Sequence, residues 1–100
     1  MDREQVIKVA ADYARRVRSV INPKDIILYG SYNKGTANVN SDIDIAVVFE
    51  KFDGDYWQTV QKLHELTIWV DTRIEPVLLE DSDDPSGFVK AIRRDGFKVS

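Results

Sequence analysis

The sequence predicts a small α/β domain in which helices pack against one mixed β-sheet. Three observations predict this class: helical periodicity of apolar residues near the N-terminus, short apolar runs at residues 25–29 and 43–49, and helix-forming segments that alternate with such runs. The resulting order, αβ(α)βαβα, is typical of a sheet covered by helices. Since 100 residues fit one compact domain, we expect a single domain over residues 1–100.

The first expected helix covers residues 3–21. Its apolar side chains recur at three- and four-residue steps from Val6 to Val20. Pro23 ends the pattern, because proline clashes with a continuing helix. Residues 25–29 (DIILY) are then typical of a short strand that is buried on both faces.

The next segment predicts a turn and a second strand. Gly30 and Ser31 end the first strand, and residues 32–41 show no period, although a single helical turn directly after Ser31 fits. Residues 43–49 (IDIAVVF) predict a second buried strand. Asp44 stands inside this strand, where aspartate is depleted.

The second half predicts a further helix and strand. Asp55 can cap a helix that ends near Trp69. Residues 73–79 predict a third strand, at the sheet edge or at a bulge, because Pro76 cannot donate to the strand ladder.

The C-terminal segment predicts a last helix. Asp84 and Pro85 form an N-cap followed by a first-turn proline, and Gly96 ends the helix. We expect residues 97–99 to add a short strand.

Composition and charge exclude several classes of function. The 14 Lys and Arg against 17 Asp and Glu give a net charge of -3, which opposes binding to nucleic acid or anionic membranes through a broad positive field. The absence of cysteine excludes disulfides, thiolate metal sites and a cysteine nucleophile. The longest apolar run, residues 45–49, is far shorter than the ~20 residues of a membrane span, and the charged start lacks the apolar stretch of a signal peptide. We therefore expect a cytoplasmic protein without a membrane or nucleic-acid partner.

Residues 30–48 (GSYNKGTANVNSDIDIAVV) carry the candidate chemistry. Gly30 and Ser31 follow a buried strand, where unpaired backbone N–H groups at the start of a helical turn favour a phosphate. Lys34 adds a cation to the same loop. A plain tight turn is the alternative interpretation of a Gly-Ser pair.

Asp42 and Asp44 are a stronger signal. Their two-residue spacing in a strand places both carboxylates on one face, about 6.6 Å apart at the backbone. Ionised carboxylates on a buried strand require compensation, and Mg²⁺ supplies it with oxygen ligands. The alternative interpretation is a turn residue at position 42 and a solvated face at position 44.

A third carboxylate is expected, because paired metal ions need more ligands than two aspartates and a nucleotide provide. Asp71 and Glu75 are the two candidates, and about 13 Å of strand would separate them, so that only one reaches the metals. We prefer Glu75, because it lies inside an apolar run. The alternative for Glu75 is a charge that protects an edge strand from aggregation.

A Gly-Ser pair, ten residues, a D-x-D pair and a carboxylate on the next strand resemble the minimal nucleotidyltransferases, the smallest members of the polymerase-β-like nucleotidyltransferase superfamily. The resemblance implies that fold, and it implies transfer of a nucleoside monophosphate, AMP from ATP, to an acceptor hydroxyl with two Mg²⁺ ions. The expected catalytic and metal-binding residues are Asp42, Asp44 and Glu75. The expected nucleotide-binding residues are Gly30, Ser31, Lys34 and Ser41.

The resemblance also implies a partner. Larger relatives carry a helical domain that completes the cleft, and here a separate helical protein of the HEPN class would complete it, with this chain as an antitoxin that adenylylates the toxin. Self-association is a second route. The alternative functions are an inactive binding module that neutralises its partner by contact, and a nucleotidyltransferase for small molecules.

Three further residue types with catalytic potential have simpler interpretations. His64 is the only histidine, so it fits helix packing better than a metal site or a triad. Ser31 has no identifiable base beside it, which disfavours a covalent nucleophile. Trp57 and Trp69 are expected to be core or interface anchors.

Overall fold

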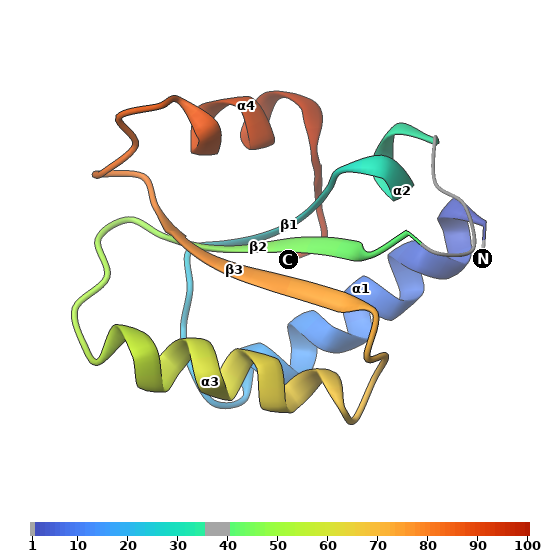
Figure 1. The fold of residues 1–100 in the computed structure, drawn as a ribbon, viewed down its shortest axis with the longest axis horizontal. Helices are drawn as coiled ribbons and strands as arrows, with labels where there is room; N and C mark the ends of the chain where they lie inside the picture. Colours follow the sequence, from blue (N-terminus) through green and yellow to red (C-terminus); the bar gives the residue numbers. More distant parts are fainter. Residues whose placement is uncertain (1, 36–40) are drawn as a thin grey trace.

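The computed structural model describes residues 2–35 and 41–100, and it shows a four-stranded sheet between helices (Figure 1). Within these ranges no helix is long and apolar enough to cross a membrane. The elements are α1 (Arg3–Arg18), β1 (Asp25–Tyr29), α2 (Ser31–Lys34), β2 (Ile43–Phe49), α3 (Tyr56–Thr67), β3 (Ile74–Glu80), α4 (Phe88–Asp95) and β4 (Phe97–Lys98).

The sheet is mixed, as the sequence predicts. Its strand order is β3-β2-β1-β4. Strand β1 runs antiparallel to both neighbours, and in its pairing with β2 Tyr29 lies opposite Asp44. Strands β2 and β3 are parallel, with Asp44 opposite Glu75. The expected edge position of Pro76 is confirmed, because β3 has β2 as its only neighbour in the sheet.

Helices α1 and α3 cover one face of the sheet (Figure 1). Their apolar sides pack on alternate residues of the three longer strands, including Ile26, Ile45 and Ile74, all of which are buried. The hydroxyl of Tyr13 in α1 donates a hydrogen bond of 2.7 Å to the carbonyl oxygen of Leu63 in α3. Burial raises the pKa of Tyr13, so this hydroxyl remains a donor at neutral pH and joins the two helices.

Helix α4 covers the opposite face. Ile27, Ala46 and Val48 form a second, smaller core with Val89 and Ile92 of the helix. The last residue of α4 meets α2, where the side-chain amide of Asn33 donates a hydrogen bond of 2.7 Å to the carbonyl oxygen of Asp95.

Three polar side chains project from this second face. Because side chains alternate along a strand, Tyr29, Asp44 and Glu75 lie two residues from members of the second core and share its side of the sheet. All three lie at the end of the sheet beside α2, where β1 ends and β2 and β3 begin.

Several element ends differ from the sequence prediction. Helix α1 ends at Arg18 rather than at residue 21, and its guanidinium donates a hydrogen bond of 2.9 Å to the carbonyl oxygen of Pro23, which closes the turn early. Strand β3 starts and ends one residue later than expected, and β4 is one residue shorter. The bounds of β1 and β2 match the prediction.

The start of α4 corrects the expected N-cap. The helix begins at Phe88, with Gly87 at the N-cap position and a φ of 75°. Asp84 nevertheless caps the helix from a distance, because its two carboxylate oxygens accept hydrogen bonds from the backbone N–H groups of Val89 (2.9 Å) and Lys90 (3.1 Å).

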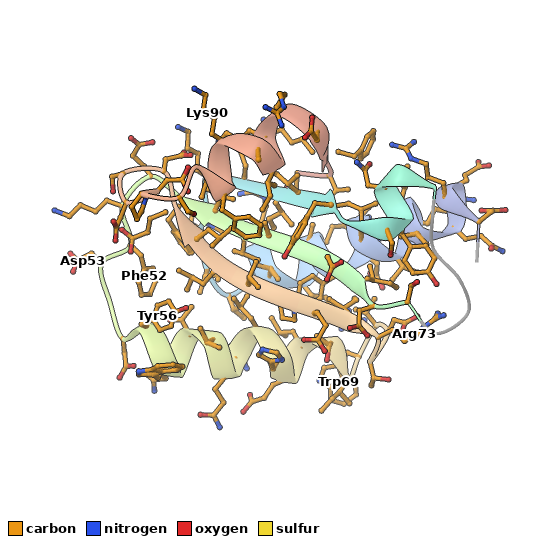
Figure 2. The ribbon with its side chains drawn as sticks, turned by 45° about the horizontal axis from the view of Figure 1, so that its top comes forward. Phe52, Asp53, Tyr56, Trp69, Arg73 and Lys90 are labelled. Atoms are coloured by element: carbon orange, nitrogen blue, oxygen red, sulfur yellow. The ribbon has the colours of Figure 1, made fainter. Side chains whose placement is uncertain are left out.

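The expectation of core tryptophans is wrong. Trp57 is 76% exposed at the start of α3, and Trp69 is 71% exposed just beyond the end of the helix. Figure 2 shows Trp69 directed away from the sheet. The remaining interpretation, a role at an interface, depends on a partner.

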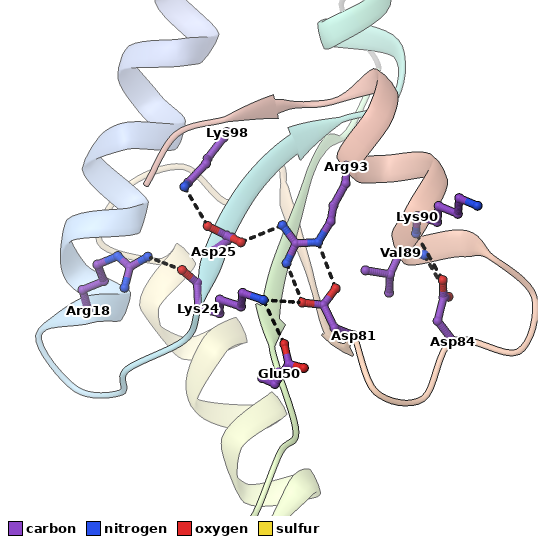
Figure 3. Close-up of polar contacts among 10 residues, drawn as sticks. All are labelled: Arg18, Lys24, Asp25, Glu50, Asp81, Asp84, Val89, Lys90, Arg93 and Lys98. Carbon is purple, nitrogen blue, oxygen red and sulfur yellow. Dashed lines mark hydrogen bonds and ion pairs between the residues drawn. The ribbon is translucent and has the colours of Figure 1, made fainter.

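An ion-pair network joins α4 to the end of the sheet away from α2 (Figure 3). Arg93 of α4 binds Asp25 at 2.6 Å and Asp81 at 2.7 Å. Lys98 pairs with Asp25 and Lys24 with Asp81. Burial pushes the pKa of Asp25 upward, but hydrogen bonds from Lys98 and Arg93 outweigh it and hold that pKa below its ordinary value.

Candidate nucleotidyltransferase site

The turn after β1 brings a glycine against a carboxylate. Gly30 has a φ of 79°, a conformation that suits glycine, and Ser31 begins the single helical turn of α2. A Cβ atom at position 30 would lie 2.2 Å from Oδ2 of Asp44, so the Asp44 carboxylate rests directly on the Gly30 backbone. The structure thus brings the Gly-Ser corner and the D-x-D pair together.

The charges of two carboxylates act on a third at this corner. Asp44 is half-buried, while Asp42, just before β2, and Glu75, on the neighbouring strand, are exposed. Burial is the main cause that raises the pKa of Asp44, and the negative charges of Asp42 and Glu75 raise it further. This surrounding is therefore electrostatically unfavourable for the ionised form of Asp44.

The competing third carboxylate, Asp71, is already engaged. It lies before β3, where Nε and Nη2 of Arg73 donate hydrogen bonds to its two oxygens at 3.0 and 2.7 Å. The backbone N–H of Arg73 donates a third, at 2.9 Å. These hydrogen bonds, the side-chain ones above all, hold the pKa of Asp71 below its ordinary value. Glu75, in contrast, contributes its charge to the surroundings of Asp44.

Sequence reasoning missed Tyr29. Its ring packs edge-on against Phe88, with centroids 5.9 Å apart. Burial raises the pKa of its hydroxyl, and the charges of Asp44 and Glu75 add to this effect. The alternation within DIILY places Tyr29 on the same face as Asp44 once the strand pairing is known, but no local motif marks it.

Two expected nucleotide-binding residues have incomplete surroundings. Lys34 ends α2, but its side chain lies outside the part of the chain that the structure describes, as do residues 36–40. Ser41 directly precedes Asp42 and is partly exposed. Both expected contacts to the nucleotide thus belong to the segment of the chain between the Gly-Ser corner and β2.

The donor set fits a hard divalent cation. Carboxylate oxygens are the ligands that Mg²⁺ prefers, and in the described ranges no lysine or arginine forms an ion pair with Asp42, Asp44 or Glu75. Among the described residues, however, no three acidic, histidine or cysteine side chains converge into a closed metal cage. Mutual repulsion of carboxylates explains why such side chains stay apart without a cation between them.

Comparison with known proteins assigns the family. A family model described as "Nucleotidyltransferase domain" matches residues 9–92, which contain all the candidate site residues. The chain belongs to this nucleotidyltransferase domain family. The fold class is thereby confirmed, since this mixed sheet with its covering helices matches the polymerase-β-like nucleotidyltransferase fold.

Two solved structures are similar to this nucleotidyltransferase domain. A Sulfolobus solfataricus protein assigned to the nucleotidyltransferases has a TM-score of 0.66 at 18% identity, over 96% of this chain and 80% of that one. A toxin–antitoxin structure with AMP-PNP has a TM-score of 0.62 at 26% identity, over 90% of this chain and 72% of that one. A comparison with curated proteins found no match.

Proposed function

We propose that this nucleotidyltransferase domain is a magnesium-dependent enzyme that transfers AMP from ATP to a hydroxyl group of a protein acceptor. The observation that carries the proposal is the position of the Asp44 carboxylate. It lies against the backbone of Gly30, and the charges of Asp42 and Glu75 contribute to its raised pKa. A phosphate-binding corner and metal-binding carboxylates must be neighbours for this chemistry, and here they touch.

The residues of the corner have distinct roles in the proposal. Backbone N–H groups at Gly30 and Ser31 bind the triphosphate, because the N–H dipoles at the start of a helical turn favour an anion. Lys34 and Ser41 add contacts to the nucleotide from the same loop. Positioning and electrostatic stabilisation dominate such phosphoryl-type transfers.

Asp42, Asp44 and Glu75 would hold magnesium, two ions by the family resemblance. When bound, the metal neutralises charge on the triphosphate and lowers the pKa of the acceptor hydroxyl. The acceptor oxygen forms a bond to the α-phosphorus, the bond from that phosphorus to the bridging oxygen breaks, and pyrophosphate leaves. Glu75 receives the proton of the acceptor.

The acceptor that we propose is a helical toxin of the HEPN class, with this chain as its antitoxin. The similarity to a toxin–antitoxin structure with AMP-PNP supports both a protein partner and an adenine nucleotide. The 26% identity of that match extends over 90% of this chain.

Labelled nucleotide tests the transfer. The purified chain and the product of the adjacent gene are incubated with Mg²⁺ and ATP labelled at the α- or the γ-phosphate. We expect label from the α-position alone on the partner chain, and none with Asp44→Asn. If the partner binds the chain but takes up no label, the proposed enzymatic function is wrong, and the chain is a binding module that neutralises its partner by contact.

A melting experiment tests the metal separately from the acceptor. Mg²⁺ should raise the melting temperature of the wild type, because a cation relieves the repulsion among the carboxylates. Asp44→Asn should reduce this rise. An equal rise in both proteins would show that magnesium binds elsewhere, whatever the transfer assay gives.

A further inference from the structure

Helix α3 and its C-cap residue Ile68 carry an exposed seam that the proposed reaction does not use. Four exposed side chains follow one another at spacings of four, three and four residues: Trp57, Gln61, His64 and Ile68. This spacing aligns them along one side of the helix, as in the seam of a coiled coil. Trp57 and Ile68 are 76% and 69% exposed and form the two apolar ends.

The seam is complementary to itself when it is reversed. A two-fold axis through its midpoint brings Trp57 opposite Ile68 of a second copy, so that apolar meets apolar at both ends. The same axis brings Gln61 opposite His64, where an amide and an imidazole can hydrogen-bond. A two-fold contact requires this kind of self-complementary patch.

The ring of Trp57 packs against a neighbouring aromatic ring, which restricts its orientation. Phe49, Phe52, Tyr56 and Trp57 form a chain of edge-to-face contacts, with ring centroids 5.0, 6.4 and 5.1 Å apart. Figure 2 shows Phe52 and Tyr56 facing each other at the start of α3. An ordered aromatic side chain loses little entropy on binding and makes an effective anchor.

We propose that two copies of this protein form a two-fold symmetric dimer in which their α3 seams pack antiparallel. Helix α3 has 12 residues and is about 18 Å long. At about 150–250 Å² each, the two tryptophans would bury about 300–500 Å² in total, and a contact limited to the two seams belongs among the small interfaces of weak complexes. Helix α3 covers the sheet face opposite α4 (Figure 1), so both nucleotidyltransferase sites stay accessible.

Sedimentation velocity from micromolar to millimolar concentration tests the dimer. We expect the wild type to shift from monomer towards dimer, and Trp57→Glu to remain a monomer. Trp69→Glu is the matched control: it adds the same charge to a similarly exposed tryptophan that lies just beyond the end of α3 and outside the seam, so it should dimerise like the wild type. Circular dichroism checks that both variants fold.

Cysteine cross-linking tests the antiparallel direction, since the chain has no cysteine of its own. A mixture of Gln58→Cys and Ile68→Cys chains should link with a short bismaleimide, whereas neither variant should link to itself. A wild type that stays monomeric at millimolar concentration overturns the proposal. The proposal is overturned in that case even if a different protein is later found to bind the seam. Equal loss of the dimer in both tryptophan variants overturns the proposed surface. Neither result bears on nucleotide transfer.

Discussion

Gly30 and Asp44 constrain each other at the scale of single residues. The positive φ of Gly30 turns the backbone away from β1, and the missing side chain leaves room for the Asp44 carboxylate. The carboxylate in turn sits in a half-buried position beside two other acids, which raises its pKa. The ionised form of Asp44 therefore opposes folding at neutral pH.

Gly30→Ala should destabilise the fold by about 2–3 kcal/mol, because the new methyl group adds a clash with Asp44 to the backbone strain. Gly35→Ala is the control, since Gly35 has a similar φ of 77° but no neighbouring atom within 4 Å of a Cβ. It should cost about 1 kcal/mol. Urea unfolding measures both, and equal losses would contradict the close approach of Asp44.

Asp44→Asn should raise the melting temperature of the metal-free protein by a few degrees at pH 7. The folded-state pKa of Asp44 is raised, so its ionised form opposes folding above the pKa of about 3.9 that an unfolded aspartate has. The gain should therefore disappear as pH falls below about 4. Melting curves between pH 3 and pH 8 measure this, and a gain independent of pH would point to another cause.

Motif spacing predicted part of the corner, and the rest depends on contacts distant in sequence. The ten residues between Gly30-Ser31 and the D-x-D pair allow two neighbouring strands to bring the motifs together. The exposure of Trp57 could not be predicted from the sequence around it. The start of α3 extends past the sheet (Figure 1), so whether Trp57 is covered depends on segments distant in the sequence. The assignment of Glu75 as third carboxylate stays a prediction.

Helix α4 depends on one side chain at the scale of elements. Arg93 joins it to Asp25 at the start of β1 and to Asp81 just after β3. Asp25 is only 5% exposed, so its charge needs these partners. Arg93 thereby fixes α4 to the end of the sheet away from the Gly-Ser corner.

Arg93→Ala should destabilise the protein by about 2 kcal/mol, since Asp25 would keep Lys98 as its remaining cation. Because the folded-state pKa of Asp25 is lowered, the contribution is complete above about pH 4 and is lost as pH falls further. The gap between variant and wild type should narrow there. Arg94→Ala, which removes an exposed pair with Asp95, should leave stability unchanged. Urea titrations at pH 7 and pH 3 measure both.

Asp84→Ala should cost about 1 kcal/mol, because two backbone N–H groups at the start of α4 lose their acceptor. Asp83→Ala, in the same exposed loop, is the control and should have little effect. Thermal melts compare the two. Equal effects would show that loop charge rather than capping matters.

Local chemistry predicted the presence of the elements better than their ends. Strands β1 and β2 are bounded by turn-forming and charged residues, so their limits were clear. The start of α4 was misplaced because Asp84 does bind the helix start, but across an intervening turn that ends at Gly87. The end of α1 depends on Arg18 reaching Pro23, which periodicity does not encode.

The topology of the sheet positions the site at the scale of the whole molecule. Element order and class were predictable from the alternation of periodic segments. The strand order β3-β2-β1-β4 and the parallel pairing of β2 with β3 arise from packing across the chain, which no local pattern records. That the chain acts as a single domain stays a prediction.

The parallel pairing of β2 with β3 determines when the site can exist. A parallel partner is reached through a crossover, and here the chain must complete α3 before Glu75 arrives beside Asp44. A chain still emerging from the ribosome, with β3 not yet released, holds Gly30, Asp42 and Asp44 but lacks Glu75, the proposed third carboxylate. Competence for the proposed nucleotide transfer would then be acquired late in synthesis, once β3 has paired with β2.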